Sequence, residues 1–330
     1  MRRAARSVAV TARCFEETLQ HLREAPGVGS VVANASAEPW NRNELIEKAR
    51  DASALICFMT DFVDAPLLDS LPRLGIVACA LKGFDNFDIK ECASRGIAVT
   101  AVPDLLTAPT AELALALALG LGRRLRECDA SMRSGGFRGW RPELYGTGIE
   151  GSKIGLLGCG AVGLAVSKRI QGFEPKRILY YDVQAVSGGL GLERVGSVAE
   201  LVSECDFLFV CSPLNAATRH VIGREALKSA KPNLMLINIS RGSCVDECAV
   251  ADALEEGRIG GYAADVFEFE DWKLPGRPQS VEPRLLTHPN TLLMPHVGSA
   301  VESARRGIEL AAANEVKRWL AGEALHHRVN

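Results

Sequence analysis

The chain has 330 residues, more than a single hydrophobic core usually fills, so we expect two domains. Its 38 basic and 40 acidic side chains give a net charge of −2, which excludes nucleic acid and anionic membranes as expected partners because no large field of one sign is left. Ten cysteines without CxxC spacing, and no apolar run near the roughly 18 residues of a membrane span, favour a cytoplasmic protein with reduced thiols.

The first hundred residues alternate short apolar runs with amphipathic segments. The apolar runs predict strands at 8–11, 31–33, 54–58, 76–81 and 97–102. The segments between them have helical spacing at 15–23, 43–50 and 88–95. This alternation is typical of a parallel sheet covered by helices, so it predicts one α/β domain.

A second series begins after an Ala/Leu-rich segment, 110–128, that predicts one helix buried between the domains, with Pro109 in its first turn. The six strands predicted after it are 153–157, 177–181, 207–211, 234–239, 261–266 and 291–294. Six strands complete a dinucleotide-binding sheet. The segment 272–283, rich in Pro and Gly, predicts a surface loop, and 300–320 predicts a helix that returns to the first domain.

A glycine-rich turn, GCGAVG, joins the first strand of the second series to a helix. Alone this pattern is weak, and a packing turn is the alternative, but Asp182 ends the next strand 19 residues after Gly163, as the dinucleotide fingerprint requires. The turn lets a pyrophosphate approach the helix N-terminus, and Asp182 would accept hydrogen bonds from ribose hydroxyls and repel a 2′-phosphate. We therefore expect NAD as the cofactor, with NADP less favoured. The predicted cofactor-binding residues are Gly158, Gly160, Ala161, Val162, Gly163, Asp182, Pro213, Ser240 and Asp265.

Three titratable or charged residues, Arg241, Glu270 and His296, follow predicted strands of the second domain. Taken singly, each has an ordinary explanation: a surface ion pair, an acidic loop or a structural histidine. In a doubly wound sheet, however, all strand ends of this kind open on one crevice. A histidine exchanges protons near neutral pH, a carboxylate stabilises its charged form, and an arginine binds an anion through two hydrogen bonds. Together they predict a catalytic site.

Four segments resemble the D-2-hydroxyacid dehydrogenases. They are 158–163, Ser240-Arg241-Gly242-Ser243, 265–270 and Pro295-His296-Val297-Gly298. The resemblance implies that Arg241, Glu270 and His296 are catalytic and that the protein is a homodimer. It also implies two doubly wound parallel-sheet domains, with a Rossmann NAD-binding domain at 108–297 inserted in a flavodoxin-like substrate-binding domain, 1–107 plus 298–330.

One segment departs from most of that family: Ala80-Leu81-Lys82-Gly83-Phe84-Asp85-Asn86 places an ammonium group after a strand. A snorkelling surface lysine is the alternative. The segment 81–88, together with 102–107, 139–148, 261–265 and 270–272, resembles the phosphite (phosphonate) dehydrogenase branch of the family. That resemblance implies that Lys82, Arg241 and Gly83 hold the substrate anion. It implies further substrate contacts from Met59, Trp140, Tyr145 and Ser299.

The resulting hypothesis is oxidation of phosphite to phosphate, with hydride transfer to NAD, water as the nucleophile and His296 as the base. One alternative is a D-2-hydroxyacid dehydrogenase, in which His296 takes the hydroxyl proton and Arg241 binds the carboxylate. Another is a non-catalytic protein that senses NAD. The fold alone does not separate these alternatives.

Overall fold

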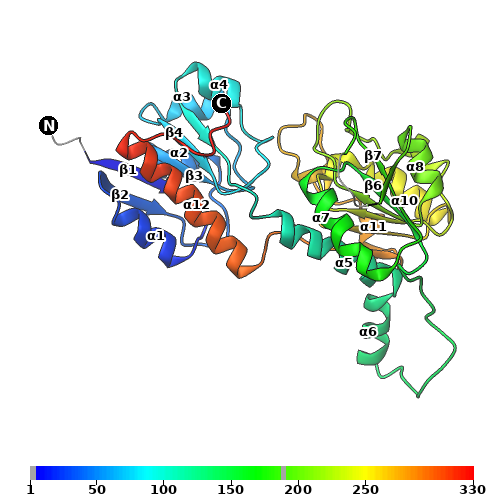
Figure 1. Ribbon diagram of the computed structural model, residues 1–330. Helices are drawn as coiled ribbons and strands as arrows, with labels where there is room; N and C mark the ends of the chain where they lie inside the picture. The colour runs from blue at the N-terminus through cyan, green and yellow to red at the C-terminus, as the bar shows by residue number, and fades with distance from the viewer. Residues whose placement is uncertain (1–4, 187–190) are drawn as a thin grey trace. The chain divides into compact units, whose positions relative to one another are not determined.

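A computed structural model describes residues 5–186 and 191–330. The chain divides into two compact units, Met1–Leu106 with Ala300–Asn330, and Thr107–Ser299 (Figure 1). Each unit is built on one parallel sheet. Among the described residues, no helix is both long enough and apolar enough to cross a membrane.

The sheet of the first unit has the order β2-β1-β3-β4-β5 in the described part of the chain. Its strands are β1 (Arg6–Val10), β2 (Val28–Ala33), β3 (Ala52–Cys57), β4 (Ile76–Cys79) and β5 (Ala98–Thr100). All neighbouring strands are parallel, and the order is that of flavodoxin-like folds, as expected. The strands β4 and β5 are shorter than predicted because the buried residues that follow them, such as Leu81 and Val102, belong to loops rather than to the sheet.

Helices cover both faces of this sheet. In the described part of this unit the helices are α1 (Glu16–Arg23), α2 (Arg42–Ala49), α3 (Ala65–Ser70), α4 (Ile89–Ser94) and α12 (Glu302–Ala321). One face packs against apolar side chains of α2, α3 and α4, and the other against those of α1 and α12. Asn41, Asp64 and Asp88 cap α2, α3 and α4 by accepting hydrogen bonds from backbone N–H groups of the first turn.

The sheet of the second unit has the order β12-β11-β10-β9-β6-β7-β8 among the described residues. Its strands are β6 (Lys153–Leu157), β7 (Arg177–Tyr181), β8 (Leu192–Arg194), β9 (Phe207–Val210), β10 (Met235–Asn238), β11 (Gly261–Ala264) and β12 (Thr291–Leu293). From β8 to β11 this is the Rossmann order, extended by β12. The prediction of six strands was therefore wrong by one, because β8 is a three-residue edge strand with only one apolar residue.

The helices of this unit are α5 (Thr107–Gly122), α6 (Leu125–Arg133), α7 (Ala161–Ile170), α8 (Val198–Glu204), α9 (Arg224–Leu227), α10 (Glu247–Glu255) and α11 (Pro283–Thr287). The prediction of one helix over 110–128 was wrong, since the chain breaks between α5 and α6 at Arg124, which has a left-handed φ of 53°. In the break, the carbonyl of Gly122 accepts a hydrogen bond from the Thr147 N–H at 2.7 Å. The residues 272–282 form a loop, as predicted, whereas Pro283, the last residue of the predicted loop, begins α11.

Candidate active site

The glycine-rich turn connects β6 to α7, as the sequence predicted. Gly158 has a φ of +89°, and a Cβ there would lie 2.7 Å from the backbone nitrogen of Ser212. A Cβ on Gly163 would overlap the carbonyl oxygen of Gly158, whereas Gly160 faces open space. The backbone of the turn is therefore not covered by side chains at the start of α7. The N–H groups of Gly160, Ala161 and Val162, together with the positive end of the helix dipole, could bind an anion there. The residues present fit a dinucleotide pyrophosphate.

The carboxylate of Asp182 lies beside this turn. Its Oδ2 accepts a hydrogen bond from the Cys159 N–H at 2.8 Å, and its Oδ1 accepts one from the Gln184 N–H at 3.0 Å. Arg194, on β8, donates to the backbone oxygen of Asp182 at 2.8 Å. Burial raises the pKa of the Cys159 thiol to about 11, so this side chain stays uncharged at neutral pH and does not repel an anion. No sequence pattern pointed to Arg194.

Arg241 follows β10 and begins a 3-10 turn, η2 (Gly242–Cys244). The buried side chain of Asn238 fixes the approach to this turn: its amide donates to the Arg241 carbonyl at 3.0 Å, and its oxygen accepts from the Ser240 backbone at 3.2 Å. Arg241 itself is half-buried and donates to the Ser240 carbonyl at 2.8 Å. Pro213 follows β9 and is exposed, so the predicted residues Pro213, Ser240 and Arg241 all lie at the carboxyl edge of the sheet.

Glu270 and His296 are in direct contact. Glu270 lies in a second 3-10 turn, η3 (Glu268–Glu270), which follows β11, and His296 follows β12. The imidazole Nδ1 lies 2.6 Å from Oε2 of Glu270, so it donates to the carboxylate and leaves Nε2 for a substrate. The other oxygen of Glu270 accepts from the Phe267 N–H at 2.9 Å. Both side chains are about one quarter exposed, which gives access to a reactant while limiting solvent screening.

Asp265 holds the backbone beside His296. Its two carboxylate oxygens accept hydrogen bonds at 2.7 Å from the N–H groups of Val297 and Gly298. Burial raises its pKa, an effect opposed by these hydrogen bonds. His296 has a left-handed φ of 55°, which costs about 1–3 kcal/mol for a residue other than glycine and which this anchoring sustains. Ser299 lies three residues beyond His296 and is half-buried.

The remaining predicted substrate residues of the first unit follow neighbouring strands. Met59 comes after β3, and Lys82 and Gly83 come after β4, so all three lie at the carboxyl edge of that sheet. Lys82 is an exposed cation whose Nζ lies 2.7 Å from Oδ1 of Asp104. The Asn86 amide donates to the Met59 carbonyl at 3.3 Å, which links the two loops. The structure therefore brings these three residues together within their unit.

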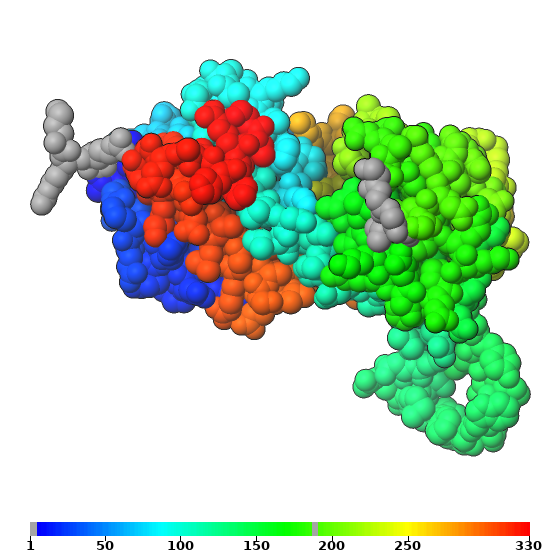
Figure 2. All heavy atoms as spheres, viewed as in Figure 1, coloured from blue at the N-terminus to red at the C-terminus, as the bar shows by residue number. Residues whose placement is uncertain are grey.

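Trp140 and Tyr145 lie elsewhere in the second unit. They belong to the segment after α6, part of which projects with α6 from the rest of its unit (Figure 2), and their exposed fractions are 78% and 71%. Tyr145 lines a cleft with Met235, Gly260 and Thr291, which lie at or next to the first residues of β10, β11 and β12. This is the edge of the sheet opposite to Arg241 and His296. Within one chain, the two aromatic residues are not brought to the catalytic groups.

Residues 115–298 match the family model described as D-isomer specific 2-hydroxyacid dehydrogenase, NAD binding domain. The chain is also 40% identical over 296 residues to a glyoxylate reductase of Thermococcus litoralis, covering 88% of this chain and 87% of the relative. The chain belongs to the D-isomer-specific 2-hydroxyacid dehydrogenase family. It is therefore an NAD(P)-dependent oxidoreductase, and the match to the NAD-binding domain falls within the second unit.

Other members of the family agree with this assignment. A glyoxylate reductase of Pyrococcus furiosus is 36% identical and covers 87% of each chain. A crystal structure of a Thermus thermophilus protein superposes with a TM-score of 0.88 at 32% identity, covering 98% of this chain and 100% of that one. An NADPH-dependent glyoxylate/hydroxypyruvate reductase from Sinorhizobium meliloti, in complex with NADP and malonate, gives a TM-score of 0.83 at 29% identity, covering 99% of this chain and 97% of that one. The Thermococcus and Pyrococcus relatives are named glyoxylate reductases rather than phosphite dehydrogenases, so the family is confirmed and the narrower branch is not.

Proposed function

We propose that this protein interconverts a small 2-keto acid and the corresponding D-2-hydroxyacid with NAD(H), and that glyoxylate is the first substrate to test. The observation that carries the proposal is the contact between His296 and Glu270 at the carboxyl edge of the sheet that holds the glycine-rich turn. We take glyoxylate from the names of the relatives. The residues Arg241, Glu270 and His296 provide the anion-binding and acid–base groups that its reduction requires.

Each step of the reduction then has a group to perform it. The guanidinium of Arg241 binds the substrate carboxylate through two hydrogen bonds. The turn 158–163 would hold the dinucleotide, whose chemistry when bound would be hydride transfer to the keto carbon. His296 donates its Nε2 proton to the oxygen of the former carbonyl group, and Glu270 stabilises the imidazolium that precedes this transfer. In the reverse direction His296 takes the hydroxyl proton, so atoms and charges balance both ways.

A direct assay tests this proposal. Purified protein is mixed with NADH and glyoxylate, then with hydroxypyruvate and pyruvate, and the loss of NADH absorbance is followed. We expect turnover of at least one keto acid and loss of that turnover in His296→Gln. Absence of activity with all three acids would overturn the substrate class.

Phosphite oxidation is a second candidate, and Lys82 is the observation that favours it. Lys82 is an exposed cation at the carboxyl edge of the first unit's sheet, and an ammonium group suits a substrate with more negative charge than a monocarboxylate. In this reaction hydride leaves phosphorus for the oxidised cofactor, water forms the new P–O bond, and His296 takes the water proton. NADH formation from NAD and phosphite is the test.

We also propose a homodimer in which α6 and the segment after it contact a second copy of the chain. Large apolar side chains are exposed there on Leu125, Met132, Phe137, Trp140 and Tyr145. Patches of this kind mark protein–protein contacts. If Trp140 and Tyr145 surround a substrate, a second copy must receive them, because their own sheet carries its catalytic groups at the other edge. Sizing of Phe137→Ser/Trp140→Ser by light scattering, with monomer expected, tests this interface.

A further inference from the structure

The turn η3 carries two glutamates, and each contacts a histidine. Glu270 contacts His296, as described above, while Oε2 of Glu268 lies 2.7 Å from Nε2 of His220. The two histidines share an unusual backbone conformation, with φ values of 55° and 50°. Strained residues of this type persist only where the surroundings fix them, and they gather near functional sites. The pair of His220 and Glu268 has this conformation as well, although neither residue takes part in the proposed reaction.

Glu268 is also paired with another buried glutamate. The Glu268 N–H donates to Oε1 of Glu247 at 2.7 Å, and the Glu247 N–H donates to Oε1 of Glu268 at 3.0 Å. The two residues are only 8% and 2% exposed. Burial, with the nearby Glu268 and Glu270 carboxylates, raises the pKa of Glu247 to about 7. The carboxylate of Glu268 has two partners, the His220 ring and the Glu247 N–H.

This reciprocal pair connects the loops that carry the catalytic residues. Glu247 begins α10, six residues after Arg241, whereas Glu268 lies two residues before Glu270. Nearby, the Ser243 N–H donates to Oδ2 of Asp271 at 2.7 Å. Gly242 packs so tightly on the backbone of η3 that a Cβ would overlap Phe267. The turns η2 and η3 are therefore fixed to each other by polar contacts and by close packing.

His220 attaches a third loop to the same assembly. It follows β9 and the predicted cofactor residue Pro213, and its N–H donates to the Ser243 carbonyl at 2.7 Å. Two residues later, the Ile222 N–H donates to the Cys244 carbonyl at 3.2 Å. A single histidine thus holds η2 through its backbone and η3 through its ring. The loops after β9, β10 and β11 meet at this point.

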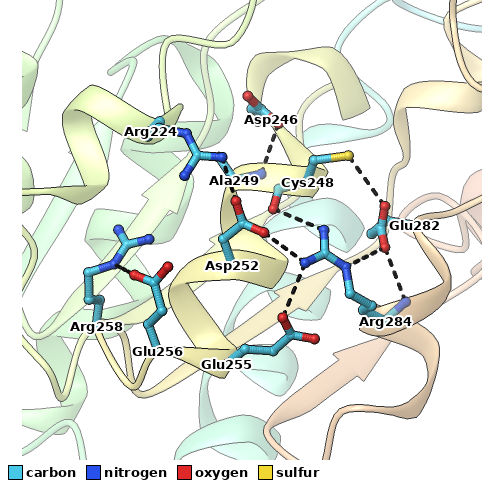
Figure 3. A network of polar contacts seen from close by, with 10 residues as sticks. All are labelled: Arg224, Asp246, Cys248, Ala249, Asp252, Glu255, Glu256, Arg258, Glu282 and Arg284. Carbon is cyan, nitrogen blue, oxygen red and sulfur yellow. Dashed lines mark hydrogen bonds and ion pairs between the residues drawn. The ribbon is translucent and has the colours of Figure 1, made fainter.

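On the outer side, Glu247 is continuous with a surface network of ion pairs. Its Oε2 accepts from the Glu282 N–H at 3.2 Å. Glu282 in turn binds Arg284 at 2.8 Å, and Arg284 contacts Asp252 on α10 at 2.7 Å (Figure 3). Glu247 therefore has a fixed support, and displacement of Glu268 is resisted from both sides.

We propose that Glu268, together with His220 and Glu247, is a positioning residue for the reaction: it holds η3 where Glu270 meets His296 and fixes the loop of Arg241 beside it. The titratable groups that face Glu247 and Glu268 include Glu270 from η3, Cys248 from α10, Glu282 before α11, Cys244 from η2 and Tyr262 from β11. The kinetic test of this inference rests on the proposed function, whereas its spectroscopic test needs no substrate.

The variants Glu268→Gln and His220→Gln test the inference by replacing one hydrogen-bonding partner at a time. We expect kcat for glyoxylate reduction to fall about ten-fold, since misplaced catalytic groups slow the chemical step, while KM for NADH stays within about two-fold. The spectroscopic readout is the Nδ1–H proton resonance of His296, shifted downfield by its short bond to Glu270. It should move upfield in both variants, and it needs no turnover.

Matched controls are His288→Gln and Glu193→Gln, whose side chains lie away from the three loops and bond to Asn290 and Arg177. Both should keep wild-type kcat and the wild-type His296 resonance. Unchanged kcat and resonance in folded Glu268→Gln and His220→Gln would overturn the inference. If Glu268→Gln does not fold, kcat and the His296 resonance are measured in His220→Gln alone, since His220 is partly exposed and its replacement should be tolerated. A wild-type protein that reduces no keto acid contradicts the proposed function, whereas an unmoved His296 resonance contradicts the positioning role.

Discussion

Nδ1 of His296 and Oε2 of Glu270 lie 2.6 Å apart, although 26 residues separate them in the chain. They follow neighbouring parallel strands, β12 and β11, whose carboxyl ends bring the two loops to one edge of the sheet. The contact fixes the orientation of the imidazole ring.

Replacement of either His296 or Glu270 should lower kcat and leave the affinity for NADH unchanged. For His296→Gln we expect kcat to fall by roughly 10²–10⁴-fold, the usual contribution of a positioned acid–base group. Glu270→Gln should cause a smaller loss because the imidazole remains. Single-turnover kinetics and NADH fluorescence titration separate the two effects, and a loss of NADH binding in step with kcat would contradict the assignment.

Lys82→Ala distinguishes the two candidate substrates. Glyoxylate reduction should change little, because Arg241 binds the carboxylate, while any phosphite oxidation should fall below detection, since a second cation is needed for a more highly charged anion. Lys90→Ala, another exposed lysine of the same unit, is the control. Phosphite turnover that survives Lys82→Ala would remove the one observation in favour of that reaction.

Gly163→Ala should destabilise the protein and weaken NAD binding, because its new Cβ has no room beside the Gly158 carbonyl. Forced packing of this kind costs about 1–3 kcal/mol in the free energy of unfolding. Gly160→Ala places its Cβ in open space and should cost less than about 1 kcal/mol at this helix N-cap. Urea unfolding of the two variants measures the difference, and equal costs would contradict the steric argument.

Asp182→Ala should raise the use of NADP relative to NAD. The change removes a carboxylate that would repel a 2′-phosphate and leaves Arg194, which already contacts the Asp182 backbone, to bind that group. Ratios of kcat/KM for the two cofactors measure the change, and Asp182→Ala/Arg194→Ala should lose most of the gain. An unaltered ratio in Asp182→Ala would show that the carboxylate does not select the cofactor.

Asp61 should make stability depend on pH. Its buried carboxyl accepts hydrogen bonds from the Thr11 hydroxyl and the Phe58 N–H, and burial raises its pKa to about 6. Between the unfolded value near 4 and pH 6, the folded state holds a proton that the unfolded chain has released. The contribution of Asp61 to stability therefore falls as pH rises through this window, by up to about 1.4 kcal/mol per pH unit.

Asp61→Asn should remove this dependence, because the amide oxygen accepts the same bonds and does not titrate. The measurement is the free energy of unfolding at pH 4, 5 and 6 for wild type and variant, with the exposed Asp51→Asn as control. A parallel pH dependence in wild type and Asp61→Asn would show that the carboxyl titrates normally.

The sheets and the catalytic set could be predicted because their signals are local or follow from topology. Buried parallel strands give continuous apolar runs, and because the carboxyl ends of parallel strands share one edge, the sequence predicts that Arg241, Glu270 and His296 follow strands at the same edge. The edge strand β8 and the helix break at Arg124 could not be predicted in this way. The strand β8 contains a single apolar residue, and the break depends on a positive φ at Arg124, which an arginine does not favour.

The group around Glu268 could not be predicted for a different reason. Glu268, Glu270 and Asp271 form an acidic run that in sequence is typical of a solvated loop, yet Glu268 and Asp271 are buried. Their partners, His220 and Glu247, lie 48 and 21 residues before Glu268 and belong to other loops. Only the folded chain decides which acids in such a run face inward.

The position of α12 at the end of the chain determines when the first unit can finish folding. Its apolar residues Ile308, Ala312 and Val316 fill one face of a sheet whose strands are all within the first hundred residues. Synthesis proceeds from the N-terminus, so the ribosome completes the second unit while the first still lacks this face. We expect the first-made strands to be the last to become protease-resistant, and chains stopped before residue 300 to be recognised by chaperones.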